Sequence, residues 1–513
     1  MSPQPRPSRF LGAGIGILSV AAAVAVGHLV AAFTGPGSSP FLAVGDTVIR
    51  FSPQFLTEFA KTTFGTADKP VLLGGMAVVI LAAAVVAGLA GRRRVGRGVT
   101  VVVALGLLGL ATVVTAPTFR ALDLVAPLVS LVVGPAVFLG LHRLARRSSD
   151  VEPHGLSRRA ALLGGMAAVA VVAVASGVGG LPAGSGLAES RARMTDRLAR
   201  ARLAERAPAI PAGADFAELG TPPFLTSNAD FYRIDVALRV PELRAEDWSL
   251  RIHGMVDREV TLTVDDLLAR PLVERTVTMT CVSNPIGGDL VSTATFTGID
   301  LRDLLREVGV RPGAEQIFAT SVDGWTAGTP TDVVMEPARG AMLALGMNGE
   351  ALPPEHGYPV RMLVPGLYGF VSATKWLVDL ELTTFDARRA YWLERGWAQR
   401  APIKTQSRID FPRGFQTVPP GRVRCAGIAW SQPVGVGGVE VRMDGGPWRP
   451  ATLTTEVSGR TWRMWTVDFD LAPGSHTVQV RATDANGAVQ TEQRTDPIPD
   501  GASGQPATIF TVG

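Results

Sequence analysis

Long uncharged apolar runs fill most of the first 182 residues of this 513-residue chain, and no other feature of the sequence constrains the fold as strongly. A transmembrane helix needs about 20 consecutive, mainly apolar residues, which buried helices of soluble proteins rarely sustain. Five runs meet this condition: Leu11–Phe33, Val71–Gly91, Gly98–Phe119, Leu124–Leu141 and Ala160–Leu181. The sequence therefore predicts an all-α transmembrane bundle of five helices over residues 1–182.

Arginine residues are concentrated in alternate connections between these runs. They precede the first run, separate the second from the third and separate the fourth from the fifth: Arg6, Arg9, Arg92, Arg93, Arg94, Arg97, Arg143, Arg146, Arg147, Arg158 and Arg159. Short cytoplasmic loops of membrane proteins carry an excess of Lys and Arg. We therefore expect a multi-pass protein of the cell membrane, in contact with lipid, with everything after Pro182 on the extracytoplasmic side.

A twin arginine stands directly before the fifth run. The segment Ser157-Arg158-Arg159 resembles a twin-arginine export signal. Arginines that only mark the cytoplasmic side of a span would give the same pattern. Both interpretations stay open on the sequence alone.

Two histidines lie within or beside the apolar runs and were considered as haem ligands. In the expected topology, His28 and His142 fall near opposite membrane faces, so they cannot share one iron. Other ionisable groups are almost absent from the runs, which argues against an ion pathway. The runs are therefore interpreted as an anchor or as a docking surface for another membrane protein.

Residues 183–221 are predicted to form a linker. Its stretch Arg191–Arg206 is rich in Ala and Arg and is expected to be helical, either on the anionic membrane surface or in solvent. The net charge of +4 comes from dispersed arginines, a pattern that does not suit nucleic-acid binding. The two cysteines, Cys281 and Cys425, provide neither a disulfide framework nor a zinc cluster.

From Pro222 onward the pattern changes to short β-type runs interrupted by Gly, Pro and Asp. Alternating or β-branched runs predict strands at Val236–Val240, Trp248–His253, Val260–Leu262 and Thr276–Thr280. The segments that begin at Thr263 and Asp300 have the signature of capped helix starts. Mixed α+β is the fold class that follows.

Three motifs in this part of the chain occur in a characteristic order. They are the loop Thr278–Pro285 around Cys281, the stretch Met347–Arg361, and Ala373–Leu377. Together they resemble the sulfite oxidase family of molybdopterin-dependent oxidoreductases over residues 222–412. The last part, residues 413–513, resembles that family's immunoglobulin-like C-terminal β-sandwich, which often forms homodimers.

The resemblance implies a molybdenum–molybdopterin cofactor, with Cys281 as the catalytic metal ligand. A soft thiolate suits this metal. Cys281 has two alternative interpretations: a buried structural cysteine, and a disulfide with Cys425 in an oxidising compartment. Cys425 lies in a strand-like run and is expected to belong to the core of the C-terminal domain.

The resemblance also implies the residues that would bind the cofactor. Arg361 and Lys375 would meet its anionic part and His356 would hydrogen-bond to it. The remaining matched positions are Asn228, Phe231, Tyr232, Asp323, Ala373 and Thr374. The alternative for each charged residue is an ordinary surface charge, and Asp323 before Gly324 can equally be a turn aspartate.

Two positions depart from the sulfite-oxidising members of the family. Those members carry an arginine and a tyrosine where this chain has Pro285 and Leu345, so we expect that sulfite is not the substrate. Oxygen-atom transfer with a small S- or N-oxide is the reaction that the family then offers. A membrane-tethered binding protein without catalysis is the alternative. The chain has no CxxC motif or iron–sulfur cysteine set, so its electron donor or acceptor is unknown and must be a separate molecule.

Overall fold

The computed structural model describes residues 8–53, 56, 59, 63–64, 68–116, 119–147 and 186–513. The chain divides into two compact units. The first contains Met1–Gly186 and Val236–Val240, and the second contains Leu187–Asp235 and Pro241–Gly513. Most of the predicted membrane region thus falls in the first unit, and the predicted α+β and β-sandwich domains fall together in the second.

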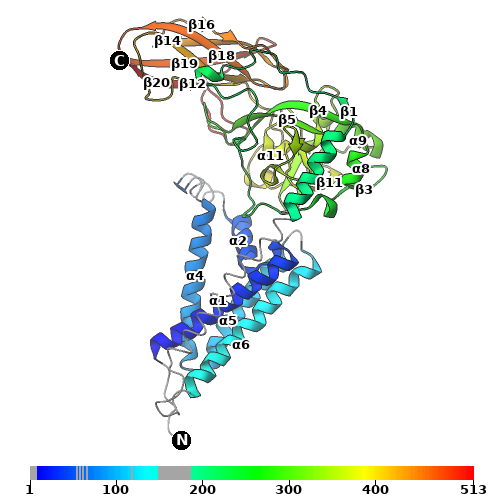
Figure 1. Ribbon diagram of the computed structural model, residues 1–513, viewed down its shortest axis with the longest axis vertical. Coiled ribbons are helices and arrows are strands. Elements are labelled where there is room, and N and C mark those ends of the chain that lie inside the picture. The colour runs from blue at the N-terminus through cyan, green and yellow to red at the C-terminus, as the bar shows by residue number, and fades with distance from the viewer. Residues whose placement is uncertain are drawn as a thin grey trace. The chain divides into compact units, whose positions relative to one another are not determined.

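The first unit is helical (Figure 1). Its helices are α1 (Arg9–Thr34), α2 (Pro40–Phe51), α4 (Asp68–Gly91), α5 (Val95–Val114) and α6 (Val125–Arg147). Four segments within it are long and apolar enough to cross a membrane, with mean hydropathies of 2.0 to 2.6. The described residues thus contain four such helices, not five, and the predicted fifth span, Ala160–Leu181, lies outside them.

The bounds of the predicted spans agree with the helices to within three residues except at two ends. One is the end of the fourth run, which was expected at Leu141, whereas α6 continues to Arg147. The third run was expected to continue to Phe119, but α5 ends at Val114, three residues before Pro117. Proline disfavours helical geometry in the residue before it, which accounts for the earlier end. The short helix α2 was not predicted, because its 12 residues are too few for a span.

Close contact between α1 and α4 depends on small residues spaced four apart. A Cβ atom added to Gly16 would lie 2.0 Å from the Ala84 carbonyl oxygen, and one added to Gly88 would lie 2.0 Å from the Gly12 carbonyl oxygen. Small residues at this spacing let helix backbones approach closely in a membrane, where there is no hydrophobic driving force between helices. The close approach of α1 and α4 therefore requires glycine at these positions.

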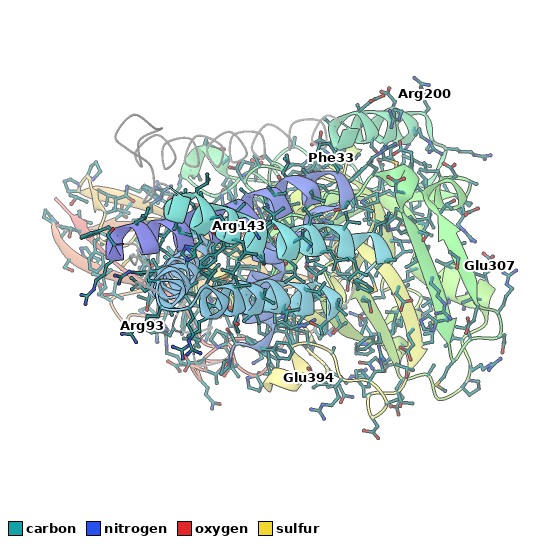
Figure 2. The ribbon with its side chains drawn as sticks, turned by 90° about the horizontal axis from the view of Figure 1, so that it is seen from below. Phe33, Arg93, Arg143, Arg200, Glu307 and Glu394 are labelled. Carbon is teal, nitrogen blue, oxygen red and sulfur yellow. The ribbon has the colours of Figure 1, made fainter. Side chains whose placement is uncertain are left out.

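Arginines lie together at one end of the helical unit. At one end, Gly12 faces Arg92, and Gly91 faces His142. Arg93 and Arg143, which Figure 2 labels, follow these residues in the chain, whereas Phe33 belongs to the other end of α1. His28 also lies toward that other end, where its Nδ1 is 3.1 Å from Ser39 Oγ. The prediction that the two histidines lie at opposite ends is confirmed.

The α+β part of the second unit contains two sheets (Figure 1). The first has the order β1-β4-β5-β8-β10, with β9 (Glu350–Ala351) beside β8: Leu203–Glu205, Leu272–Thr280, Val291–Asp300, Met342–Met347 and Arg361–Leu363. The second has the order β3-β2-β11-β6-β7: Val260–Thr263, Ser249–Gly254, Leu377–Thr383, Gln316–Ser321 and Thr326–Pro330. This confirms the α+β class.

Local capping fixes where the helices of this part begin. Thr263 caps α8 (Val264–Leu268) in a reciprocal capping box with Asp266, and Asp300 caps α9 (Leu301–Val308). The other helices are α10 (Thr331–Met335) and α11 (Gly369–Ser372). The predicted strand at Val236–Val240 is wrong, since these residues form no strand. Alternation alone does not supply the partner strand that a β-strand needs.

The segment predicted as a linker is part of the second unit. Residues 186–200 form a helix, and Met194 and Leu198 on it are buried in the core of the α+β part. Ser190 Oγ lies 2.8 Å from the Tyr358 hydroxyl, and β1 pairs with β4. The helix therefore packs on the α+β part through its apolar side, whereas the sequence predicted a linker.

The C-terminal part is a β-sandwich. One sheet has the order β12-β14-β18-β17: Gln406–Phe411, Gly421–Trp430, Arg463–Leu471 and Thr452–Leu453. The other has the order β13-β20-β19-β15-β16: Thr417–Val418, Ala507–Val512, Gly474–Asp484, Val436–Met443 and Arg449–Pro450. Cys425 is fully buried in the core between them and forms no disulfide with Cys281. Burial raises the pKa of its thiol to about 12, as expected for a core cysteine.

The sandwich holds the end of β4 in place. The Trp462 backbone N–H donates to Thr278 Oγ1 over 2.8 Å, and Gln432 Nε2 donates to the Thr278 carbonyl oxygen over 2.6 Å. Thr278 stands three residues before Cys281. The sandwich therefore helps to position the loop that carries the cysteine.

Candidate active site

Cys281 begins the loop that leaves β4 and is 9% exposed. Its backbone N–H donates to the Leu290 carbonyl oxygen over 3.0 Å, so the loop closes on itself. Asn284, which is buried, accepts a hydrogen bond from the Leu290 N–H and donates its own N–H to the Cys281 carbonyl oxygen. The loop thus holds the thiol at a defined place at the end of the sheet.

Two tyrosines lie in the electrostatic surroundings of Cys281. Burial raises the pKa of Tyr232, and the nearby Cys281 raises it further, while Arg361 opposes the shift. Burial likewise raises the pKa of Tyr368, with smaller contributions from Asp500 and Cys281. Tyr232 was predicted as a site residue. Tyr368 was not, because it lies between the second and third motifs and only the fold brings it to the cysteine.

Arg361 is a buried cation with few partners. Its side chain lies 5.8 Å from the centre of the Phe296 ring, and Nη1 donates to the His356 carbonyl oxygen over 3.1 Å. Nε is buried and has no hydrogen-bond partner among the residues that the structure describes. Burial lowers its pKa to about 10, so the guanidinium stays charged at neutral pH. Because no carboxylate of the described residues compensates its charge, an anionic ligand beside Arg361 would be favoured.

Gly357 lets two of the predicted motifs come together. Its φ is +106°, and an added Cβ would lie 2.9 Å from the Lys375 Cα and 3.1 Å from the Arg361 Cβ. Thr374, next to Lys375, is fully buried, and its hydroxyl has no partner within the described residues. Ala373 is also buried. The loop after β9 and the loop before β11 therefore form one surface, with unsatisfied donors on it.

His356 and the first predicted segment share this surface. His356 Nε2 lies 3.0 Å from the Asn228 carbonyl oxygen, and its ring packs edge-on against Phe231. Burial, followed by the charge of Arg361, lowers the His356 pKa to about 4, so the imidazole is neutral at pH 7. The Asn228 amide binds Asn348 and Glu350. These contacts bring the predicted residues together, although they are far apart in sequence.

Lys375 differs from Arg361 because it already has a carboxylate partner. Its Nζ lies 3.0 Å from Asp235 Oδ2, which also accepts from Arg233 Nε over 2.8 Å. Burial lowers the pKa of Lys375 to about 8 although Asp235 opposes the shift. Asp323 accepts from the Trp325 N–H as a turn aspartate, and it also belongs to the same electrostatic cluster. Sequence reasoning missed Asp235, which no motif marks.

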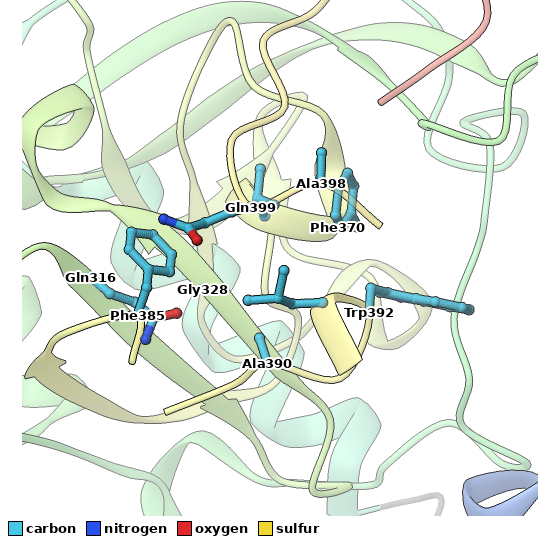
Figure 3. A pocket seen from close by; sticks show the side chains of 10 residues that line it. Gln316, Gly328, Phe370, Phe385, Ala390, Trp392, Ala398 and Gln399 are labelled. Atoms are coloured by element: carbon cyan, nitrogen blue, oxygen red, sulfur yellow. The ribbon is translucent and has the colours of Figure 1, made fainter. Parts of the chain in front are cut away.

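The two positions that depart from sulfite oxidases lie in different surroundings. Leu345 is completely buried in β8 as part of the core. Pro285 is exposed and lines a cavity of about 260 Å³. A second crevice, lined by Phe370, Phe385 and Trp392, has a volume of only about 10 Å³ (Figure 3). That is about the space of one water molecule, so the crevice holds no substrate.

The part of the chain that contains this site is similar in sequence to known oxidoreductases. Residues 237–392 match the oxidoreductase molybdopterin binding domain. Sulfite oxidase of Gallus gallus is 29% identical over 326 residues, which cover 53% of this chain and 70% of that one. Mitochondrial sulfite oxidase of Rattus norvegicus is 30% identical, over 48% of this chain and 53% of that one. Thus the chain spans about half the length of the rat relative.

Relatives with other reactions also match. The NADH nitrate reductase of Spinacia oleracea is 32% identical over 178 residues, which cover 30% of this chain and 19% of that one. Among solved structures, the sulfane dehydrogenase of Paracoccus pantotrophus aligns at 23% identity over 57% of this chain and 84% of that one, with a TM-score of 0.49.

The matched domain defines a molybdopterin-binding oxidoreductase. Over about half of its length the chain is similar to enzymes of the sulfite oxidase family, and the described residues carry four candidate membrane helices near the N-terminus.

Proposed function

We propose that the protein is a membrane-tethered molybdenum-cofactor enzyme that transfers an oxygen atom to or from a small S- or N-containing substrate other than sulfite. The observation that carries this proposal is that a buried thiol, Cys281, and the buried, incompletely hydrogen-bonded guanidinium of Arg361 both lie near Tyr232. A thiolate suits molybdenum, and a guanidinium suits the phosphate of a pterin cofactor. When bound, the cofactor supplies two-electron oxygen-atom-transfer chemistry.

The roles of the protein residues follow from their contacts. Cys281 ligates the metal, and Arg361 pairs with an anionic group of the cofactor. The unsatisfied Thr374 hydroxyl and the neutral His356 are polar groups suited to the pterin edge. Lys375 contributes to cofactor binding as an ion pair with Asp235.

The remaining proposed contacts line the same surface. Phe231 stacks on Tyr232 and provides an apolar wall, while Asn228 holds His356 through its carbonyl oxygen. Ala373 leaves room beside Thr374 because its side chain is a single methyl group. Asp323 is the last of the proposed cofactor-binding residues, and the charges of Lys375 and Asp235 act on its carboxyl group.

The membrane helices set the location of this chemistry. Arg9, Arg93 and Arg143 belong to the same end of the helical unit. We propose that this end faces the cytoplasm and that the second unit is extracytoplasmic, by the positive-inside rule. Lipid, a small substrate and a separate electron carrier are the proposed partners, without nucleic acid, and the β-sandwich is the proposed surface of a homodimer.

A non-catalytic binding protein with the same fold is the second candidate, and metal analysis separates the two. The full-length protein is purified in detergent from a host that produces molybdopterin. The proposal expects about one molybdenum per chain, and loss of its thiolate spectral features in Cys281→Ser. A metal-free protein, from a host that loads a known molybdenum enzyme in parallel, supports the binding protein instead.

A further inference from the structure

A cavity of about 260 Å³ lies where the loop after Cys281 meets the last loop of the β-sandwich. The loop after Cys281 contributes Pro285 and Ile286, and the sandwich contributes Arg494, Asp496, Pro497 and Ala502. The proposed cofactor residues all belong to the α+β part, so no site described above includes the sandwich side of this cavity. The sandwich therefore has a second feature beside the cysteine loop, in addition to its hold on β4.

The two walls of the cavity are packed against each other. A Cβ added to Gly504 would lie 2.9 Å from Ile286 Cδ1. Lys404 Nζ donates to Asp500 Oδ1 over 2.9 Å and to the Gly501 carbonyl oxygen over 2.6 Å. The first contact holds the sandwich loop against the loop after Cys281, and the Lys404 hydrogen bonds hold the sandwich loop itself in place.

Tyr368 connects the cavity wall with the candidate active site. A Cβ added to Gly501 would lie 2.6 Å from the Tyr368 hydroxyl oxygen, so the phenol touches the loop that carries Ala502. The same phenol belongs to the surroundings of Cys281. On the other wall, Pro285 is four residues from Cys281 in a loop that is closed by Asn284. Both walls therefore adjoin parts of the candidate active site, Tyr368 on one side and the loop after Cys281 on the other.

The charges of the cavity indicate what it would bind. Arg494 Nη1 donates to the Gln505 carbonyl oxygen over 3.2 Å, and the side chain is exposed. Within the described residues, Arg494 and Asp496 line one cavity without forming an ion pair with each other. The walls thus offer one cation and one carboxylate, with an apolar surface from Pro285 and Ile286 between them. The volume is slightly below the usual range of small-molecule pockets, which is about 300–1,000 Å³.

We propose that this cavity receives the substrate, and that Arg494 and Asp496 select a small zwitterionic oxide, which carries one anionic and one cationic group. The inference rests on the proposed oxygen-atom transfer and names its substrate class. A dianion gains nothing from such a site, because Asp496 opposes what Arg494 attracts. A zwitterion matches both charges.

The test compares three sulfoxides of equal size on the purified full-length holoenzyme, with a reduced artificial electron carrier. One sulfoxide is uncharged, one carries a carboxylate, and one carries a carboxylate and an ammonium group. The variants are Arg494→Gln and Asp496→Asn, and Arg413→Gln is the matched control, since Arg413 is an exposed arginine of the sandwich outside the cavity. Binding of the corresponding zwitterionic sulfone, measured by calorimetry, gives a readout independent of turnover.

We expect the zwitterionic sulfoxide to have the highest kcat/KM in the wild type. Arg494→Gln and Asp496→Asn should each raise its KM roughly five- to tenfold, as expected for a partly exposed charge contact. The uncharged sulfoxide and the Arg413→Gln control should be unchanged. The sulfone should lose affinity in the same two variants.

Two other results have separate meanings. If the wild type reduces the sulfoxides but neither variant changes their KM or the sulfone affinity, the assignment of Arg494 and Asp496 is overturned while the proposed function stands. If a molybdenum-loaded wild type turns over no S- or N-oxide in either direction, the proposed function itself fails, and the inference fails with it.

Discussion

Replacing Arg361 by Met tests whether this arginine binds the cofactor or stabilises the fold. Arg361 is 3% exposed, and burial lowers its pKa from 12.5 to about 10. Each pKa unit corresponds to about 1.36 kcal/mol, so holding this charge in the folded protein costs about 3 kcal/mol. Its hydrogen bond to the His356 carbonyl oxygen returns about 1 kcal/mol. Met fills a similar volume without the charge, so Arg361→Met should leave the cofactor-free protein as stable as the wild type or slightly more stable.

The same substitution should have the opposite effect on the cofactor. A hydrogen bond to a charged group contributes about 1.5–3 kcal/mol, which is roughly ten- to a hundredfold in affinity. We expect the molybdenum content of purified Arg361→Met to fall accordingly. The assay measures thermal unfolding of protein from a cofactor-deficient host, together with metal content of protein from a cofactor-producing host.

Arg275 provides the control, because it is also a buried arginine but has carboxylate partners. It is 6% exposed and pairs with Asp300 over 2.8 Å and with Glu205 over 3.2 Å. Arg275→Met should destabilise the protein by about 1.5–3 kcal/mol, since it removes charge-assisted hydrogen bonds to two partly exposed carboxylates. If Arg361→Met destabilises the cofactor-free protein as strongly as Arg275→Met does, or keeps its full molybdenum content, Arg361 is a structural residue.

Three further predictions concern the site and the topology. Cys281→Ser should abolish activity and alter the metal's absorption, whereas Cys425→Ser should keep both; full activity of Cys281→Ser would refute the ligand assignment. Gly357→Ala should lower cofactor content and stability, because φ is +106° and the added Cβ meets Lys375 at 2.9 Å; Gly349→Ala, at φ +85° but with open space, separates backbone strain from lost contact. Reporter fusions after Arg94 and Arg147 should be cytoplasmic and one after Gly220 external, and a cytoplasmic reading at Gly220 would reverse the orientation.

The sequence was sufficient to predict features that depend on interactions between residues close together in the chain. Apolar length specifies a membrane helix without tertiary information, and the caps at Thr263 and Asp300 are hydrogen bonds within three residues. Each of the motifs around Cys281, Arg361 and Lys375 is an unbroken stretch of sequence, so its resemblance to the family is visible without the structure. The end of α5 was misplaced because hydropathy does not report where a helix unwinds.

Contacts between residues far apart in the chain could not be predicted from the sequence. Tyr368 reaches the surroundings of Cys281 only through the fold, and Asp235 meets Lys375 across 140 positions. The helix of residues 186–200 was assigned to a linker because its charge is evident in the sequence, whereas the burial of Met194 and Leu198 depends on the surface that they meet. Arg494 carries no motif at all.

Poor turnover of sulfite is the last prediction, and the structure gives it two separate grounds. Pro285 has no side-chain donor, and Leu345 is completely buried in the core, so neither supplies a group for the substrate. The cavity beside Pro285 is lined by Asp496 as well as by Arg494, and the carboxylate repels a dianion. A missing charge-assisted contact costs about 1.5–3 kcal/mol, or roughly ten- to a hundredfold in affinity. Steady-state assays should therefore give sulfite a kcat/KM at least tenfold below that of the best oxide. Pro285→Arg should improve sulfite, since the position is exposed and can accept the longer side chain. Efficient oxidation of micromolar sulfite by the wild type would mean that another cation reaches the site.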